Sequence, residues 1–295
     1  MTSVDVVIVS YNRRDLLPGC LDALAASSQP TNVVVVDNAS ADASAQFVEN
    51  TYPQVDLLAN STNLGFAAAV NRGAARGAAP FILLLNPDAR ISTDAIGALV
   101  DVMTKDDGVG AAGPRINDEQ GHLELTSGRT MSLANDAWFK CVMRLGGANA
   151  PLIGSAIRRR YAADHDSESL TAACLMVRRD AFDTVDGLDD TFFLYAEDVD
   201  FCRRLRDEGW RLRYLAGVTV QHARGASGVT AAADTDLVYR ASQVAFYAKH
   251  RGALSRGLLR AYMEIKSGVG ALLGDARAKA VWRWLRAGQP RVKVG

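Results

Sequence analysis

The sequence has few cysteines and no long apolar run. Its cysteines, Cys20, Cys141, Cys174 and Cys202, lack the short paired spacings of zinc sites or of a disulfide framework, so we expect reduced thiols. No stretch reaches the ~18 uninterrupted apolar residues of a membrane-spanning helix, and residues 1–9 enter a strand pattern without the features of a signal peptide. These absences predict a cytoplasmic protein, with peripheral attachment to the inner face of the cell membrane left open.

The sequence also lacks an excess of charge of either sign. Its 33 Lys and Arg residues balance 33 Asp and Glu residues, so no overall field attracts nucleic acid, which is not an expected partner. Apolar residues make up 48% of the 295 residues and charged residues 22%, which argues against disorder. A nicotinamide-dependent oxidoreductase is disfavoured, because Ser10-Tyr11-Asn12-Arg13 replaces G-x-G-x-x-G after the first predicted strand.

Short β-branched segments alternate with helical patterns through much of the chain. The predicted strands cover residues 4–10, 32–37, 55–59, 81–86, 171–177, 210–215 and 218–222. Predicted helices include an Ala-rich one over residues 65–77 and another over about residues 197–208, whereas residues 115–169 resemble a variable insert. This alternation indicates an α/β fold with a mainly parallel central sheet flanked by helices.

The C-terminal part has a different pattern. Its apolar residues recur at steps of three and four, at Leu254, Leu258, Tyr262, Ile265, Val269 and Leu272. Residues 251–295 contain ten basic residues against two acidic ones. We therefore expect residues 231–295 to form an amphipathic helical extension that lies on an anionic membrane surface. The alternative is a helix that packs on the rest of the protein and exposes a basic face.

Polar residues follow the first two predicted strands, where ligands of parallel α/β sheets collect. These residues are Ser10, Tyr11, Asn12, Asp37 and Asn38. Tyr11 is suited to stack on a base, and Asp37 is suited to accept the imide N–H of a uracil or thymine. Alternatively, Asp37 and Ser40 form a turn and cap the next helix.

Two further strand ends carry groups that suit a metal ion. Asn86-Pro87-Asp88 ends a buried strand with a carboxylate, which a hard cation such as Mg²⁺ or Mn²⁺ prefers, although an Asp in a proline turn is the simpler interpretation. His222 ends the last predicted strand, and a neutral imidazole is a metal ligand as well as a common structural group.

An acidic cluster begins the helix predicted near residue 197. Glu197 and Asp198 follow aromatic residues, and Asp198 is suited to act as a general base in such surroundings. Two other interpretations remain open: the acids compensate the helix dipole, or they pair with Arg203, Arg204 or Arg206 on the same helix.

In this order, several segments resemble the family 2 inverting glycosyltransferases of the GT-A fold, especially their rhamnosyltransferase-like branch. The segments are V-I-V-S-Y-N at 7–12, V-D-N-A-S at 36–40, N-L-G-F at 63–66, N-P-D at 86–88 and F-L-Y-A-E-D-V-D at 193–200. The resemblance covers residues 1–230, which would form the catalytic domain. Residues 1–114 would bind the nucleotide sugar, and residues 115–230 would bind the acceptor.

The resemblance implies roles for the nucleotide-sugar residues. Tyr11 and Asp37 would hold the pyrimidine, and Ser10, Asn12 and Asn38 would lie with them. Asn63, Gly65 and Asn71 would shape the pocket beside them.

The resemblance also implies the metal and acceptor groups. Asn86 replaces the first acid of the family's D-x-D motif, so Asp88 would be the main ligand of Mg²⁺ or Mn²⁺, with lowered metal affinity as a consequence. His222 would be a further metal or diphosphate contact. Asp198 would deprotonate the acceptor, with Glu197 beside it, and a single base agrees with inversion of configuration.

The implied reaction transfers L-rhamnose from dTDP-rhamnose to a polyprenyl-diphosphate-linked saccharide during cell-wall or surface-polysaccharide biosynthesis. The alternatives are a UDP-sugar donor, carrying galactofuranose or N-acetylglucosamine, and a non-catalytic protein that binds nucleotide sugars. The sequence leaves homodimer formation open.

Overall fold

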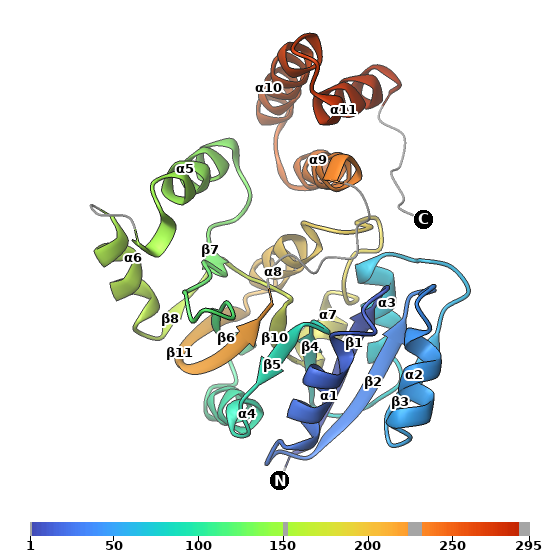
Figure 1. The fold of residues 1–295 in the computed structure, drawn as a ribbon. Helices are drawn as coiled ribbons and strands as arrows, with labels where there is room; N and C mark the ends of the chain where they lie inside the picture. The colour runs from blue at the N-terminus through green and yellow to red at the C-terminus, as the bar shows by residue number, and fades with distance from the viewer. Residues whose placement is uncertain (1, 150–152, 224–231, 289–295) are drawn as a thin grey trace.

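A mixed β-sheet forms the centre of the computed structural model, which describes residues 2–149, 153–223 and 232–288 (Figure 1). The strand order is β3-β2-β1-β4-β10-β6-β11-β5, and β8 pairs with β11. The strands are β1 Val4–Ser10, β2 Thr31–Asp37, β3 Asp56–Ala59, β4 Phe81–Leu85, β5 Ala89–Ile91, β6 Val109–Asn117, β8 His165–Asp166, β10 Cys174–Arg178 and β11 Arg211–His222. A small second sheet pairs β7 Ser127–Gly128 with β9 Ser169–Leu170.

Helices cover both faces of the sheet. They are α1 Leu17–Ala25, α2 Ser44–Thr51, α3 Phe66–Ala74, α4 Ala95–Lys105, α7 Arg179–Thr184 and α8 Glu197–Asp207. The apolar residues of α1, α2 and α4 pack with Val6, Ile8 and Leu83 on one face. Those of α3, α7 and α8 pack with Val7 and Leu84 on the other. Successive strand residues point to opposite faces, so runs rich in Val and Leu are buried on both sides.

The parallel part of the sheet confirms the predicted fold class. Strands β3, β2, β1 and β4 are mutually parallel, and β11 is parallel to β6. Strand β10 runs antiparallel between β4 and β6, and β5 is antiparallel to β11. The two strands predicted over residues 210–215 and 218–222 are a single strand, β11, with a register shift between Leu215 and Thr219. The boundary predicted near residue 114 falls inside β6, so both halves share this sheet.

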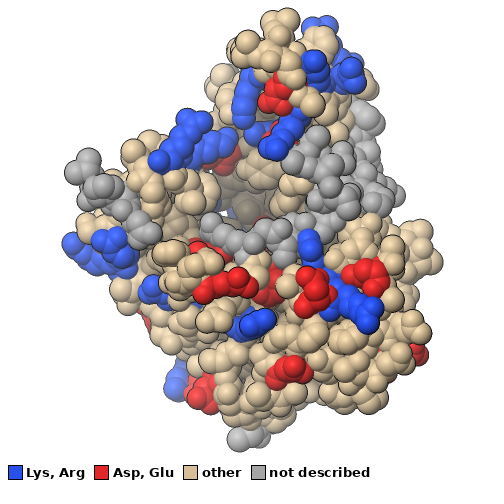
Figure 2. Space-filling model, viewed as in Figure 1, with Lys and Arg blue, Asp and Glu red and all other residues tan. Residues whose placement is uncertain are grey.

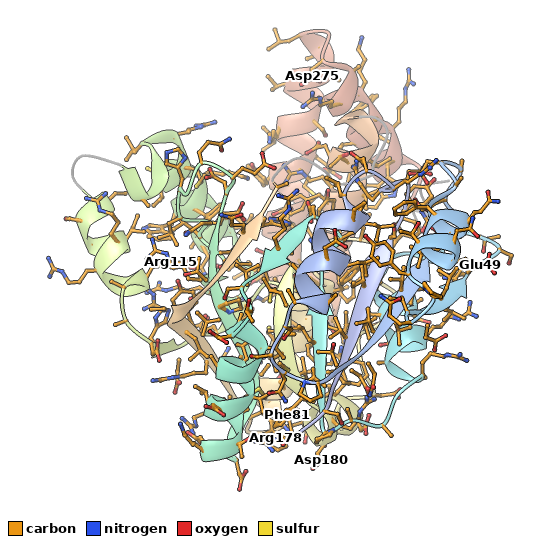
Figure 3. All side chains as sticks on the ribbon, turned by 60° about the horizontal axis from the view of Figure 1, so that its bottom comes forward. Glu49, Phe81, Arg115, Arg178, Asp180 and Asp275 are labelled. Atoms are coloured by element: carbon orange, nitrogen blue, oxygen red, sulfur yellow. The ribbon has the colours of Figure 1, made fainter. Side chains whose placement is uncertain are left out.

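The two ends of the sheet differ in character. At one end, Arg178 of β10 lies opposite Phe81 of β4, with its guanidinium 5.5 Å from the ring centroid. Figure 3 shows these two residues together with Asp180 at this end. The carboxyl ends of β1, β2 and β4 meet at the opposite end, where the polar motifs follow.

Two groups of helices lie beyond the sheet. The predicted insert contains α5 Leu133–Arg144, the 3₁₀ turn η1 Gly147–Asn149 and α6 Gly154–Tyr161. The C-terminal extension contains α9 Ala232–His250, α10 Ala253–Leu272 and α11 Ala276–Arg286. These C-terminal helices pack through a core that includes Phe246 and Met263 and reaches Phe192 and Ala196, just before α8. Within the described ranges, no helix has the length and apolarity to cross a membrane.

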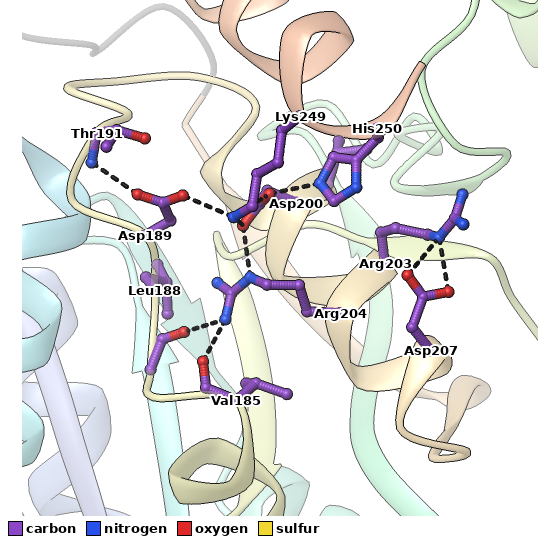
Figure 4. Close-up of polar contacts among 12 residues, drawn as sticks. Val185, Leu188, Asp189, Thr191, Asp200, Arg203, Arg204, Asp207, Lys249 and His250 are labelled. Carbon is purple, nitrogen blue, oxygen red and sulfur yellow. Dashed lines mark hydrogen bonds and ion pairs between the residues drawn. The ribbon is translucent and has the colours of Figure 1, made fainter. Parts of the chain in front are cut away.

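A buried carboxylate connects α9 to α8 (Figure 4). Asp200 is fully buried and contacts Arg204 at 2.7 Å, Lys249 at 2.9 Å and His250 at 2.6 Å. Lys249 also lies 2.6 Å from Asp189. Burial raises the pKa of Asp189, but hydrogen bonds from Lys249 and Thr191 outweigh this effect and bring the pKa to about 2. The end of α9 is therefore held against the first turn of α8 by charge.

Replacing this buried acid tests its structural weight. We expect Asp200→Asn to lower the free energy of unfolding by about 3 kcal/mol, because the largely buried guanidinium of Arg204 loses its countercharge and His250 loses its hydrogen-bond partner. Asp207→Asn on the same helix is the matched control, since Asp207 is half exposed and pairs only with Arg203 in the described structure. That change should cost less than about 1 kcal/mol. Urea denaturation measures the free energy of unfolding of both variants. Equal decreases would show that Asp200 contributes no more to stability than the exposed Asp207.

Candidate active site

The carboxyl ends of β1 and β2 place two buried polar atoms side by side. Ser10 pairs with Asp37 in the strand register, and both side chains are buried. Among the described residues, neither the Ser10 hydroxyl nor Oδ1 of Asp37 has a hydrogen-bond partner. The other oxygen of Asp37 accepts from the Ser40 N–H at 3.0 Å. Asp37 thus forms the predicted turn with one oxygen and leaves the other for a donor such as a pyrimidine imide.

Asn12 and Asn38 use their side chains to hold the neighbouring loops. The Asn12 side chain accepts from Ala41 N at 2.7 Å, and its own N–H donates to Ser40 Oγ at 2.9 Å. The Asn38 amide donates to Asn63 Oδ1 at 2.8 Å and to a backbone carbonyl, and its oxygen accepts two further hydrogen bonds. Both residues therefore form a frame that holds the loops after β1 and β2, and Tyr11, between Ser10 and Asn12, is partly exposed.

Gly65 connects this frame to the acidic cluster. It has a φ of +85°, and a Cβ at this position would lie 2.5 Å from the carbonyl oxygen of Phe193. The next residue, Phe66, donates its N–H to the same oxygen at 2.8 Å. Any side chain at position 65 would push the two segments apart, so glycine is required here.

Asn71 makes a second connection to the same region. Its amide nitrogen donates to Leu188 O at 2.6 Å, and its oxygen accepts from Leu188 N at 2.9 Å. Because both polar atoms bind the loop that precedes α8, the structure gives Asn71 a positioning role. Direct contact with a nucleotide stays a prediction.

The end of β4 and the end of β11 bring the predicted metal-binding residues together. His222 Nε2 lies 3.1 Å from Asp88 and 3.2 Å from the Asn86 amide nitrogen. Its Nδ1 lies 3.5 Å from Glu124, a buried acid. Burial lowers the pKa of His222, but Asp88 and Glu124 outweigh it and raise the pKa to about 9. The two acids therefore favour the protonated form of His222, whereas a metal ion would require a deprotonated ring nitrogen.

Asp88 and His222 fit a divalent cation only with help from a ligand. Their donor atoms converge, and one carboxylate plus substrate phosphates is the usual way in which Mg²⁺ is bound. Among the described residues, no group of three or more His, Cys, Asp or Glu side chains forms a metal site by itself. The protein would supply the carboxylate and the imidazole, and a nucleotide diphosphate would complete the coordination.

Sequence analysis missed Glu124. It lies in the predicted variable insert, where no motif marks it. A tight turn over residues 118–122, closed by an isolated bridge between Asn117 and Leu123, returns the chain and brings Glu124 to His222. Only this chain reversal makes it a neighbour of the site.

The start of α8 presents a buried acid, Glu197, and a partly buried acid, Asp198, in an unusual backbone. Tyr195 and Ala196 both have positive φ, 70° and 64°, a costly conformation that is typical of functional sites. Asp198 accepts from Val199 N at 2.8 Å. Burial raises the pKa of Asp198, and burial together with the Asp198 charge raises the pKa of Glu197 well above its ordinary value.

The arginines of α8 do not neutralise these two acids. Arg203 pairs with Asp207, and Arg204 pairs with Asp200. Pairing with Arg203 or Arg204 therefore does not account for Glu197 and Asp198, whereas their position at the helix start still allows them to interact with the helix dipole.

The acidic cluster lies beside the predicted metal-binding residues. Asn86 donates its N–H to Ala173 O at 2.9 Å, and Ala172 donates its N–H to Asp198 Oδ2 at 3.4 Å. A cavity of about 1030 Å³ contains both Asp198 and Glu124 in its lining, and α5 and α6 form its outer wall. Asp198 and Glu124 line this cavity, and Glu124 in turn contacts His222, so the candidate base and the candidate cation ligands lie in one region of the molecule.

Comparison with known proteins shows the family to which the chain belongs. The model of the family "Glycosyl transferase family 2" matches residues 5–185. An N-acetylglucosaminyl-diphospho-decaprenol L-rhamnosyltransferase of Mycobacterium tuberculosis is 32% identical over 240 residues, 77% of this chain and 78% of the relative. The rhamnosyltransferase WbbL of Escherichia coli is 24% identical over 225 residues, 74% of this chain and 83% of the relative.

A solved structure shares the fold. The mannosyltransferase PcManGT of Pyrobaculum calidifontis, in complex with GDP-Man and Mn²⁺, superposes with a TM-score of 0.58 at 18% identity. The match covers 97% of this chain and 82% of that one. The family match over more than half of the sequence and the 32% identical relative show that this chain belongs to glycosyl transferase family 2 and is a glycosyltransferase of the GT-A fold.

Proposed function

We propose that the protein transfers L-rhamnose from dTDP-rhamnose to a polyprenyl-diphosphate-linked saccharide in cell-wall or surface-polysaccharide assembly. The observation that carries this proposal is the mycobacterial relative, whose name specifies L-rhamnosyl transfer to an N-acetylglucosaminyl-diphospho-decaprenol and which aligns over 78% of its length. The buried, unpaired oxygen of Asp37 supports a pyrimidine donor.

Each side chain then has a task in the transfer. Asp37 accepts the imide N–H of thymine, and Tyr11 lies beside the base. Asp88 and His222 would hold a divalent cation, Mg²⁺ or Mn²⁺, as Mn²⁺ in the mannosyltransferase complex of the same fold suggests. When bound, the cation stabilises the negative charge that develops on the leaving diphosphate.

Asp198 acts as the base in this proposal. It takes the proton of the acceptor hydroxyl as that oxygen attacks the anomeric carbon from the side opposite the diphosphate, which inverts the configuration. Its raised pKa makes it a stronger base than a surface aspartate. The two acids at this helix start titrate as a pair, so a proton retained on Glu197 leaves the negative charge on Asp198.

The donor is the first point to test. We expect dTDP-rhamnose with Mg²⁺ or Mn²⁺ to raise the melting temperature and to be hydrolysed slowly, because the diphosphate completes the cation site. EDTA should abolish the shift. A panel with UDP-galactofuranose, UDP-N-acetylglucosamine and GDP-mannose provides the comparison, and stabilisation by a UDP-sugar alone would replace the rhamnose assignment.

The pyrimidine contact has its own test. Asp37→Ala should raise the KM for the dTDP donor by about tenfold or more, since a hydrogen bond to a charged group contributes about 1.5–3 kcal/mol. Asp56→Ala is the control, because Asp56 lies at the start of β3 and pairs with exposed Arg76. An unchanged KM in Asp37→Ala would show that the pyrimidine ring binds elsewhere.

The role of Asp198 as general base has a separate test, which also addresses the alternative of a non-catalytic protein. Asp198→Asn should lower kcat by about 10²–10⁴-fold, because it removes proton transfer, while the donor-induced thermal shift persists. In the wild type, kcat/KM should fall at acid pH as Asp198 gains a proton, with a midpoint above the ordinary aspartate pKa of about 4. Asp207→Asn on the same helix should behave as wild type. Normal turnover by Asp198→Asn would exclude this base.

A further inference from the structure

Exposed apolar side chains gather on one part of the molecule. In the described ranges, all large apolar residues with substantial exposure except Leu64 lie on α5, α10 and α11 or at the ends of these helices. They are Trp138, Phe139, Met143, Leu145, Leu254, Leu258, Tyr262, Ile265, Val269, Leu272, Leu273 and Trp282. Contiguous exposed apolar surface of this kind marks an interaction site.

Helix α10 has two distinct apolar faces. Leu259 and Met263 are buried against α9 and α11. The stripe predicted from the sequence lies on another face, where Leu254 is 78% exposed, Ile265 68% and Leu272 88%. Packing onto the rest of the protein therefore uses a different face, and the stripe remains available for a partner.

Helix α5 adjoins the stripe and extends it. Lys140 of α5 lies 5.8 Å from the ring centroid of Tyr262, and Asp136 accepts from Gln243 of α9 at 2.5 Å. Trp138 is 59% exposed and Phe139 43%. We call the exposed apolar residues of α5 and α10, with Lys140 and Lys266, the docking face.

The cavity of the active site opens at this face. Trp138, Phe139 and Lys140 belong to the docking face and also line the cavity that contains Asp198. Arg129 and Arg160 line the same cavity and have no carboxylate partner within the described structure. Figure 2 shows a hollow between the C-terminal helices and the α5–α6 region, with Lys and Arg on both sides of it.

We propose that the docking face binds an anionic lipid bilayer and so places the cavity mouth at the membrane surface. The apolar side chains enter the acyl boundary, and Lys140 and Lys266 approach the anionic headgroups. The acceptor of the proposed function enters from the bilayer past Trp138 and Phe139, and its diphosphate meets Arg129 and Arg160. This last step rests on the proposed function, whereas bilayer binding does not.

Charge favours a bilayer over a second copy of the chain. A twofold pairing sets the same patch against itself and would bring four lysines, Lys140 and Lys266 of each copy, into one interface. The acids nearby are already bonded, because Glu264 pairs with Arg260 at 3.0 Å and Asp275 caps the start of α11. In the described ranges Asp136 lies near Lys140, but neither Lys140 nor Lys266 has an ion-pair partner, and an anionic surface supplies that countercharge.

Vesicle flotation of the full chain tests the proposal. The wild type should bind phosphatidylglycerol-containing vesicles more strongly than pure phosphatidylcholine vesicles. The triple variant Leu258→Ser, Ile265→Ser, Val269→Ser should weaken binding by about tenfold for each side chain. Lys140→Gln with Lys266→Gln should weaken binding to the anionic vesicles by about fivefold for each charge and leave the phosphatidylcholine result unchanged.

Matched controls separate binding from folding. Ala261→Ser adds a hydroxyl to an exposed position of α10 without removing a large apolar group, and Arg76→Gln removes a distant exposed charge. Both should bind as wild type. Trp138→Ser with Phe139→Ser should also weaken binding, which tests whether α5 belongs to the face. Equal vesicle binding by the wild type and the triple variant would overturn the proposal. It would also be overturned if the wild type were a dimer and the triple variant a monomer.

Two readouts distinguish this proposal from the assignment of function. Transfer to a bilayer-embedded acceptor should fall in the triple variant, while donor hydrolysis stays unchanged. If no donor is turned over but vesicle binding follows the expected pattern, the docking face stands and the proposed function fails.

Discussion

The buried carboxylate of Asp200 is the constraint on which the arrangement of the site and of the C-terminal helices depends. Its charge is tolerable in the interior because the cations of Arg204 and Lys249 lie against it and His250 contacts it at 2.6 Å. These partners come from α8 itself and from the end of α9, and Arg204 also donates to Val185 O and Gly187 O. One acid thus connects α8, the loop before it and the first helix of the extension.

The acidic residues at the start of α8 lie in different surroundings and have different roles. Asp200 faces inward and is neutralised by cations. Glu197 and Asp198 receive no such partner from the arginines of α8, so burial keeps their pKa values high. Residues of nearly the same chemistry therefore act as an anchor and as a candidate base, because the helix turns them toward different surroundings.

The polar residues at the other strand ends show the same division. Asn38, Asn63 and Asn71 use their amides to hold loops, and Gly65 permits the close approach of Phe193. Ser10 and Asp37 keep a buried polar atom without a partner in the described chain. Unpaired buried atoms are costly, which makes them the better candidates for ligand contact.

The sequence by itself determined the α/β class, the first strands and the segments that meet at their ends, because hydrophobic periodicity and polar strand ends are local properties. It also determined the apolar stripe of α10. Only the tertiary structure decided which side chains remain free, that Glu124 reaches His222, and that α5 adjoins the stripe. The antiparallel insertion of β10 and the continuity of β11 were likewise not predictable. These features arise from contacts between residues distant in the chain, and no local pattern encodes which distant partner a side chain will meet.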